Sequence, residues 1–184
     1  MVRRSRLILC SLILLTAAAG CGGHTNLRDP PPPRPGLTVG VQQQFPVSDP
    51  RADPEDAYFG ELAATMLVAQ LRAEAVDAYL VPPEHPGFGD VRITGSISLF
   101  DRGNRAARCI VGLGAGRVKI GMVLNATNAA GVPIAQVSAE HSAHFCDFGD
   151  AEMKRALSAV IRDMVGDPKL RAVVFMPGAP AAPP

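Results

Sequence analysis

Apolar and polar residues recur with two different periods along the chain, and each period predicts a different kind of element. Over residues 37–44 the apolar side chains fall at every second position, which is the period of a half-buried strand. Over residues 55–75 they fall at helical spacings, which predicts an amphipathic helix. A second amphipathic helix is expected to begin after Asp150 as its N-cap and to be closed by Gly166 and Pro168. Its apolar residues are Met153, Leu157, Val160, Ile161 and Met164.

Four strands are expected between the two helices. A short extended piece covers residues 78–81, and a longer strand covers residues 91–100, with Gly95 on its apolar face, where a neighbour must pack closely. The other residues of that face are Val91, Ile93, Ile97 and Leu99. A turn at residues 125–131 separates two further strands, the second of which covers residues 133–145.

The order of these elements, β-α-β-β-β-β-α, predicts an α/β fold, in which a mixed, mainly antiparallel sheet carries two helices on one face. Only 5% of the residues are aromatic and Trp is absent, so the core is expected to be built from Val, Ile, Leu, Ala and Met. Residues 37–175 have the length of one ordinary domain. Residues 176–184 are rich in Pro, Gly and Ala and are expected to form a disordered tail.

Residues 1–20 have the three parts of a secretory signal peptide: arginines at the start, an apolar run, and small residues at the end. The run is too short for a permanent membrane-spanning helix. Ala18-Ala19-Gly20-Cys21 resembles the lipobox of bacterial lipoproteins, in which the cysteine is diacylated and becomes the mature N-terminus. Ala18 stands where the lipobox more often has leucine. The alternative is an ordinary signal peptide beside an incidental cysteine.

Residues 21–36 are interpreted as the lipidated N-terminus and a proline-rich spacer, because four consecutive prolines resist both sheet and helix. Glycine rather than aspartate follows Cys21, which under enteric-type sorting rules favours the outer membrane. We therefore expect a lipid-anchored protein of the bacterial cell envelope that faces the periplasm.

Charge argues against nucleic acid as a partner. Removal of the signal takes three arginines from the 18 basic residues, which leaves 15 against 17 acidic residues.

The glycine-rich stretch at residues 109–121 has some features of a phosphate-binding loop. A P-loop needs Lys and then Ser or Thr directly after its last glycine, whereas Arg117 stands there. A dinucleotide-binding loop opens a helix, whereas the residues that follow alternate like a strand. The stretch is therefore predicted to be a strand whose alternate glycines leave one face bare for a close neighbour. No cofactor is expected.

Two cysteines, Cys109 and Cys146, remain after the signal is removed and Cys21 is lipidated, in a compartment that permits disulfides. Their midpoint lies within the predicted turn at residues 125–131. In an antiparallel hairpin they would therefore lie nearly opposite each other, which predicts a disulfide. The alternative is a pair of buried thiols.

His141, His144, Cys146 and Asp147 lie close together and suggest a metal site. On an extended strand, however, the two histidines point to opposite faces, and a disulfide would remove Cys146 as a ligand. Solvated or edge histidines are therefore favoured, and no metal is expected. The chain has no Gly-x-Ser-x-Gly motif and no pair of acids that spacing forces together, so it is not predicted to be an enzyme.

Arginines concentrate positive charge along one predicted hairpin, at Arg102, Arg105, Arg108 and Arg117. One interpretation is a solvated edge that discourages pairing between sheets. The other is a contact with an anionic partner, such as lipid headgroups or an acidic protein of the envelope, made by Arg105, Arg108 and Arg117.

A family resemblance rests on the same hairpin. Gly103-Asn104-Arg105-Ala106-Ala107-Arg108, followed after three residues by Gly112-Leu113-Gly114-Ala115-Gly116, resembles the G-x-R-x-x-R-x-x-x-G-x-G-A-G signature of a family of uncharacterised bacterial envelope lipoproteins. The resemblance covers about residues 91–143. It implies an envelope location and an α/β fold, and it assigns no catalytic residue. The cysteine pair is particular to this sequence.

The opening strand and helix also resemble, in fold pattern, the lipoproteins of curli-secretion channels. Together these observations lead to an expected non-catalytic binding or structural role, with an envelope protein or a second copy of the chain as partner. The alternative is an oligomeric subunit of a secretion or channel assembly.

Overall fold

The elements of the computed structural model follow the predicted order, with one further helix at the end. The structure describes residues 36–82, 89–103, 117–143 and 150–175. The strands are β1 (Thr38–Gln42), β2 (Asp77–Val81), β3 (Val91–Asp101), β4 (Val118–Asn128) and β5 (Pro133–Ala143). The helices are α1 (Tyr58–Ala73), α3 (Ala151–Gly166) and α4 (Pro168–Val174), and a short 3-10 helix, η1 (Pro54–Ala57), precedes α1.

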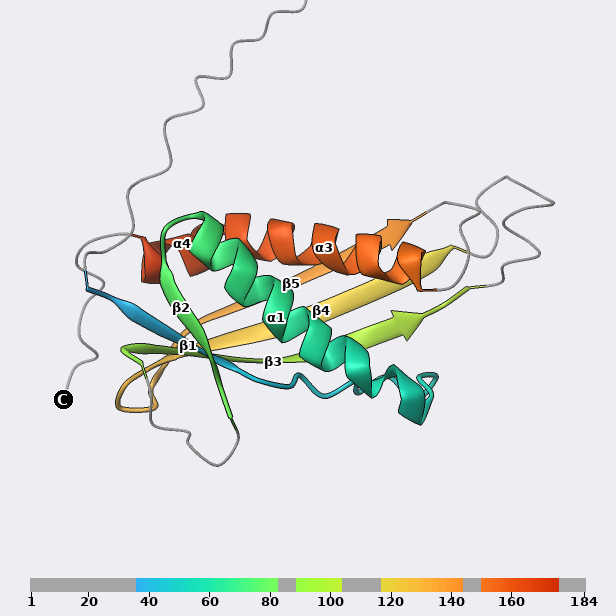
Figure 1. Ribbon diagram of the computed structural model, residues 1–184, viewed down its shortest axis with the longest axis horizontal. Coiled ribbons are helices and arrows are strands. Elements are labelled where there is room, and N and C mark those ends of the chain that lie inside the picture. Colours follow the sequence, from blue (N-terminus) through green and yellow to red (C-terminus); the bar gives the residue numbers. More distant parts are fainter. Residues whose placement is uncertain (1–35, 83–88, 104–116, 144–149, 176–184) are drawn as a thin grey trace, which may run out of the picture. The chain divides into compact units, whose positions relative to one another are not determined.

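The strands form one sheet in the order β2-β1-β3-β4-β5 (Figure 1). β1 lies parallel to both of its neighbours, β2 and β3. α1 supplies the crossover that the parallel pair of β1 and β2 requires. β3, β4 and β5 are antiparallel and form the longest ladders. The predicted fold class, an α/β fold with a mixed and mainly antiparallel sheet, is confirmed.

The helices and the sheet enclose the core between them (Figure 1). α1 contacts β1 and β2, α3 contacts β4 and β5, and the two helices also contact each other. All five apolar residues predicted for the second helix are buried on α3. The buried face of the sheet comes from alternate positions of its strands, as the period of two requires.

The core contains more aromatic side chains than the composition led us to expect. Four phenylalanines are among the largest fully buried side chains: Phe45, Phe59, Phe100 and Phe175. The rings of Phe59 and Phe100 lie 5.1 Å apart between centroids. Although aromatic residues are few in this chain, most of its phenylalanines therefore anchor loops and element ends to the core.

Near the end of β3, a shift in register changes which side chains of the strand face the core. The pairing with β4 is irregular between Ile97 and Leu99. Phe100 consequently enters the core, whereas Leu99 is only half buried and lies against Gly121. The prediction that Leu99 belongs to the apolar face was wrong for this reason, since a bulge displaces every following side chain by one position.

The further helix, α4, begins at Pro168, where the sequence predicted only the end of α3. α3 ends at Gly166, as predicted, but Pro168 then opens α4. Proline is favoured in the first turn of a helix, where its missing N–H costs nothing. The Asp167 carboxylate accepts a hydrogen bond from the backbone N–H of Lys169 at 2.7 Å and so caps the helix.

The β4–β5 hairpin is tighter than the predicted turn. β4 continues to Asn128, and the pairing of Val118 with Ala143 centres the hairpin between Ala130 and Gly131. The spacing argument for the cysteine pair assumed a centre three residues earlier, so it loses its premise.

Candidate functional site

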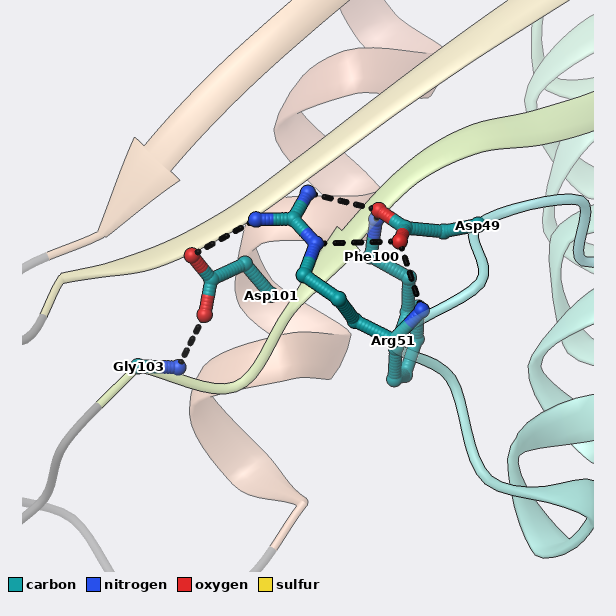
Figure 2. Close-up of polar contacts among 5 residues, drawn as sticks. All are labelled: Asp49, Arg51, Phe100, Asp101 and Gly103. Carbon is teal, nitrogen blue, oxygen red and sulfur yellow. Dashed lines mark hydrogen bonds and ion pairs between the residues drawn. The ribbon is translucent and has the colours of Figure 1, made fainter.

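The end of β3 is held by two clusters of ion pairs, each built around one arginine. In the first, Arg51 donates from Nη2 to Asp49 Oδ2 at 2.7 Å and from Nε to Asp49 Oδ1 at 3.0 Å (Figure 2). Its Nη1 lies 3.5 Å from Asp101 Oδ2. Asp49 also accepts the Phe100 backbone N–H at 2.7 Å, and Asp101 accepts that of Gly103 at 2.7 Å. We call Asp49, Arg51 and Asp101 the first cluster.

The second cluster consists of Asp56, Tyr58, Arg102 and Asp150. Arg102 pairs with the buried Asp56 carboxylate, and its Nη1 donates to Asp150 Oδ1 at 2.8 Å. The Tyr58 hydroxyl donates to the other oxygen of Asp150 at 2.6 Å. The Arg102 guanidinium also lies 5.7 Å from the ring centroids of both Phe59 and Phe100, within range of cation–π attraction.

Both clusters follow one plan, in which an arginine bridges a buried and a partly exposed carboxylate. The buried carboxylates, Asp49 and Asp56, come from the segment that follows β1, and their side chains are only 3% and 2% exposed. The outer carboxylates, Asp101 and Asp150, come from the end of β3 and the start of α3. The clusters therefore join three elements that are far apart in the sequence.

One carboxylate of each cluster, Asp49 in the first and Asp150 in the second, is stabilised in its charged form. The pKa of Asp49 lies well below its ordinary value, chiefly because Arg51 donates to it and because the backbone N–H groups of Phe100 and Arg51 do so as well. The pKa of Asp150 is lowered by the hydrogen bonds from Tyr58 and then Arg102. Partial burial, followed by the bond to Asp150, raises the pKa of Tyr58 to about 12.

These shifts are typical of structural ion pairs. A group that transfers protons in catalysis works best with a pKa near the working pH, and the pKa values of Asp49 and Asp150 move away from it. What the arrangement does is fix the backbone at Phe100 and Gly103, directly before residues 104–116.

Asp150 illustrates how tertiary contacts replace a local role. It occupies the N-cap position of α3, as predicted, but its side chain makes no capping hydrogen bond. Its two oxygens are instead bound by Tyr58 and Arg102. The predicted position of the N-cap is therefore confirmed, but the Asp150 side chain binds residues of the second cluster and does not cap the helix.

Most of the site residues predicted from the sequence lie outside the described residues. These are Cys21, Cys109, Cys146, Arg105, Arg108, His144 and Asp147, together with the glycines of residues 112–116. Lipidation at Cys21 and the Cys109–Cys146 disulfide stay predictions. Arg117 is described and is exposed directly before β4. Arg102, which was grouped with these arginines, pairs with Asp56 and Asp150 of the second cluster, and its side chain is 46% exposed.

His141 lies on β5, at the edge of the sheet, where it pairs with Ile120 and is half buried. Within residues 36–82, 89–103, 117–143 and 150–175, no group of three or more His, Cys, Asp or Glu side chains is placed to hold a metal ion. None of the helices in the described ranges is long and apolar enough to cross a membrane.

Sequence reasoning missed the two clusters, because the contacts that close them join residues about 50 to 90 positions apart: Arg51 and Asp101, Arg102 and Asp56, and Tyr58 and Asp150. The acids were judged to be scattered, and no local spacing brings them together. Residues 46–54 are rich in Pro and Asp and residues 101–104 are typical of a turn, but neither pattern indicates which arginine the aspartates contact.

Similar folds occur in solved structures of low sequence identity. The PelC dodecamer from Paraburkholderia phytofirmans is 14% identical, with a TM-score of 0.50 over 71% of this chain and 85% of that one. A DUF330 protein from Xanthomonas campestris is 11% identical, with a TM-score of 0.50 over 77% of this chain and 91% of that one. At such identities the likeness concerns the fold alone.

Sequence comparison identifies the family. Among curated proteins, none is significantly similar to this chain. The family described as "Domain of unknown function (DUF4410)" matches residues 41–146, which run from β1 through the whole sheet and are more than half of the chain. An uncharacterised family was expected from the hairpin, and the chain belongs to the DUF4410 family.

Proposed function

We propose that this chain is a lipid-anchored, non-catalytic protein of the bacterial cell envelope that assembles with copies of itself. The observation that carries the assembly is the likeness, over 71% of the chain, to the fold of a protein that forms a dodecamer. The anchor rests on the lipobox-like residues that end in Cys21. The proposed site is the outer membrane, with the domain facing the periplasm.

The anchor and the assembly support each other physically. Two or three acyl chains bind a membrane stably, whereas one chain binds only marginally. Chains held on one surface meet at a high effective concentration, so a weak contact between copies suffices for assembly. The proline-rich spacer at residues 21–36 would set the distance between the membrane and the folded domain.

The anchor is tested by intact mass and fractionation in a bacterial host, with a Cys21→Ser variant beside the wild type. We expect a mature mass that begins at Cys21 and includes acyl chains, in the membrane fraction. The Cys21→Ser form should lose both the added mass and the membrane association. An unmodified mature chain in the soluble fraction would contradict the anchor.

The assembly is tested separately, by native mass spectrometry and light scattering of the mature full chain in detergent. We expect a closed oligomer of defined size. A monomer at all concentrations would contradict self-assembly and would favour the other predicted partner, an acidic component of the envelope. In that case Arg105→Gln with Arg108→Gln should abolish co-purification of the component without changing the stability of the fold.

A further inference from the structure

An apolar groove runs along the outer side of α1 beside β2. It has a volume of about 330 Å³ and is lined by Thr65, Val68, Ala69, Arg72 and Leu80. Leu80 is 36% exposed, which is unusual for so large an apolar side chain. Thr65 and Ala69 are also exposed, and as small side chains on one face of the helix they leave the groove open. We call these five residues the groove.

The groove lies beside β2, an edge strand in which a side chain already occupies one of the free backbone carbonyls. β2 is the last strand of the sheet on this side. Val81 faces β1, because its carbonyl accepts from the Gln43 N–H, so Ala78 and Leu80 direct their backbone groups to the free edge. There Arg72 Nε donates to the Ala78 carbonyl at 2.6 Å. An added strand would have to displace Arg72, so a side chain is a better occupant than a strand.

A complementary protrusion lies at the opposite edge of the same sheet. Within the described ranges, the large apolar side chains that are clearly exposed are Tyr58, Leu80 and Val132. The Tyr58 hydroxyl is bound to Asp150, and Leu80 lines the groove. Val132 is 39% exposed in the turn between β4 and β5 and is followed by the exposed Pro133.

The turn holds Val132 in a fixed position. The Asn128 side chain accepts the Val132 N–H at 2.9 Å, and the Asn128 N–H donates to the Val132 carbonyl at 3.0 Å. Gly131 supplies the left-handed backbone that the turn needs, at φ +78°. A side chain that is already ordered loses little entropy when it is buried by a partner.

We infer that Val132 of one copy packs into the groove of the next, so that the groove and this turn form the interface of the proposed assembly. The inference rests on the proposed self-association. Two grooves placed face to face would leave Val132 uncovered. A protrusion packed into a groove removes Val132 and Leu80 from water together.

The positions of the two surfaces determine the kind of assembly. Groove and turn belong to opposite edges of one sheet, so a copy that fills its neighbour's groove leaves its own groove for a third copy. Such a head-to-tail contact closes into a ring when the rotation between copies allows it. An isologous dimer would not use both surfaces.

The interface is tested by photo-crosslinking of the mature full chain in detergent, with benzoylphenylalanine at position 132. Copies labelled with ¹⁵N and unlabelled copies are mixed before irradiation, so that links between copies are recognised by mass. We expect such links to map to residues 65–80. A probe at Arg162, exposed on α3, serves as the control and should give no link to the groove. Links from position 132 to another surface would overturn the inference.

Substitutions give a second, independent test. Ala69→Glu and Val132→Lys should each weaken assembly by about tenfold or more, since each places an unpaired charge in an apolar contact. Combining the two should restore much of the assembly through a new ion pair. Ala57→Glu is the matched control, because it makes the same change at an exposed position that lies in η1 and outside the groove.

The outcomes separate the inference from the proposed function. An oligomer that withstands both single substitutions would overturn the interface and leave self-assembly standing. A wild-type chain that is monomeric throughout would overturn both. Circular dichroism of each variant shows whether the fold is retained, and the restored double variant excludes misfolding as the cause of a loss.

Discussion

At the scale of single residues, Asp49 shows how one carboxylate organises a loop. It accepts from the Arg51 side chain, the Arg51 backbone and the Phe100 backbone, and it is almost fully buried. Each of these bonds requires an acceptor, which a carboxylate provides with both oxygens. The first cluster therefore depends on the charge of Asp49 as well as on its shape.

Asp49→Asn keeps the size of the side chain and removes its charge, so it should lower the free energy of unfolding at pH 7. Because the folded-state pKa is depressed, the stabilisation by Asp49 is fully present above its ordinary pKa of about 4 and is lost as the pH falls below that value. Urea unfolding at several pH values should show the wild type and the variant converging at acid pH. Asp163→Asn, an exposed site on α3, controls for the loss of one negative charge. If the difference in stability between the wild type and Asp49→Asn does not become smaller at acid pH, the charge of Asp49 is not the source of the stabilisation.

Gly95 was predicted to allow a close neighbour, and the structure confirms it. A Cβ atom there would lie 2.6 Å from Leu124 Cδ2 and 3.0 Å from the Val123 carbonyl oxygen. Gly95→Ala should therefore cost about 1–3 kcal/mol of stability, measured by urea unfolding. Gly166→Ala is the control, since nothing lies within 4 Å of the added atom, and it should change stability by less than about 0.5 kcal/mol. Equal stability of both variants would contradict the close packing.

At the scale of elements, the second cluster ties the end of β3 to η1 and to the start of α3. Arg102 should contribute more than Tyr58 to the free energy of unfolding, because Arg102→Gln leaves the buried Asp56 carboxylate without its guanidinium partner. We expect Arg102→Gln to cost about 1–3 kcal/mol and Tyr58→Phe less than about 1 kcal/mol, in urea unfolding. If the two substitutions cost the same, Asp56 does not depend on Arg102.

Elements were predictable to the extent that their signals are local. The two periods placed β1, α1, β3, β5 and α3 within a few residues of their observed bounds. The bulge in β3 could not be predicted, since it depends on the pairing with β4 and on the segment at Val47, which bridges to Ile97. α4 was missed because proline is typical both after the end of a helix and in the first turn of one. Pro168 was interpreted as the end of α3 alone.

At the scale of the whole molecule, the C-terminal segment closes the core. Phe175 is 2% exposed directly after α4, and the Arg171 guanidinium lies 4.3 Å from its ring centroid. Arg171 also pairs with Glu74 at the end of α1, at 2.8 Å. The last described residues thus hold α4 against the core and against the C-terminal end of α1.

Phe175→Ala should cost about 3–5 kcal/mol, as for other fully buried aromatic side chains, and should lower the midpoint of thermal unfolding accordingly. Phe175→Leu, which keeps most of the apolar volume, should cost clearly less. A Phe175→Ala variant as stable as the wild type would show that α4 is not part of the cooperative unit.

The sequence by itself determined what depends on neighbours along the chain: the alternation that makes strands, the helical spacing of α3, and the predicted lipobox at Cys21. Tertiary structure decided the rest. The ion-pair clusters, the face of Phe100, and the groove and the protruding Val132 at opposite edges of the sheet all arise from residues that are distant in sequence. The physical reason is that charge pairing, bulges and exposure depend on which elements pack against each other, and the local sequence pattern does not specify that packing.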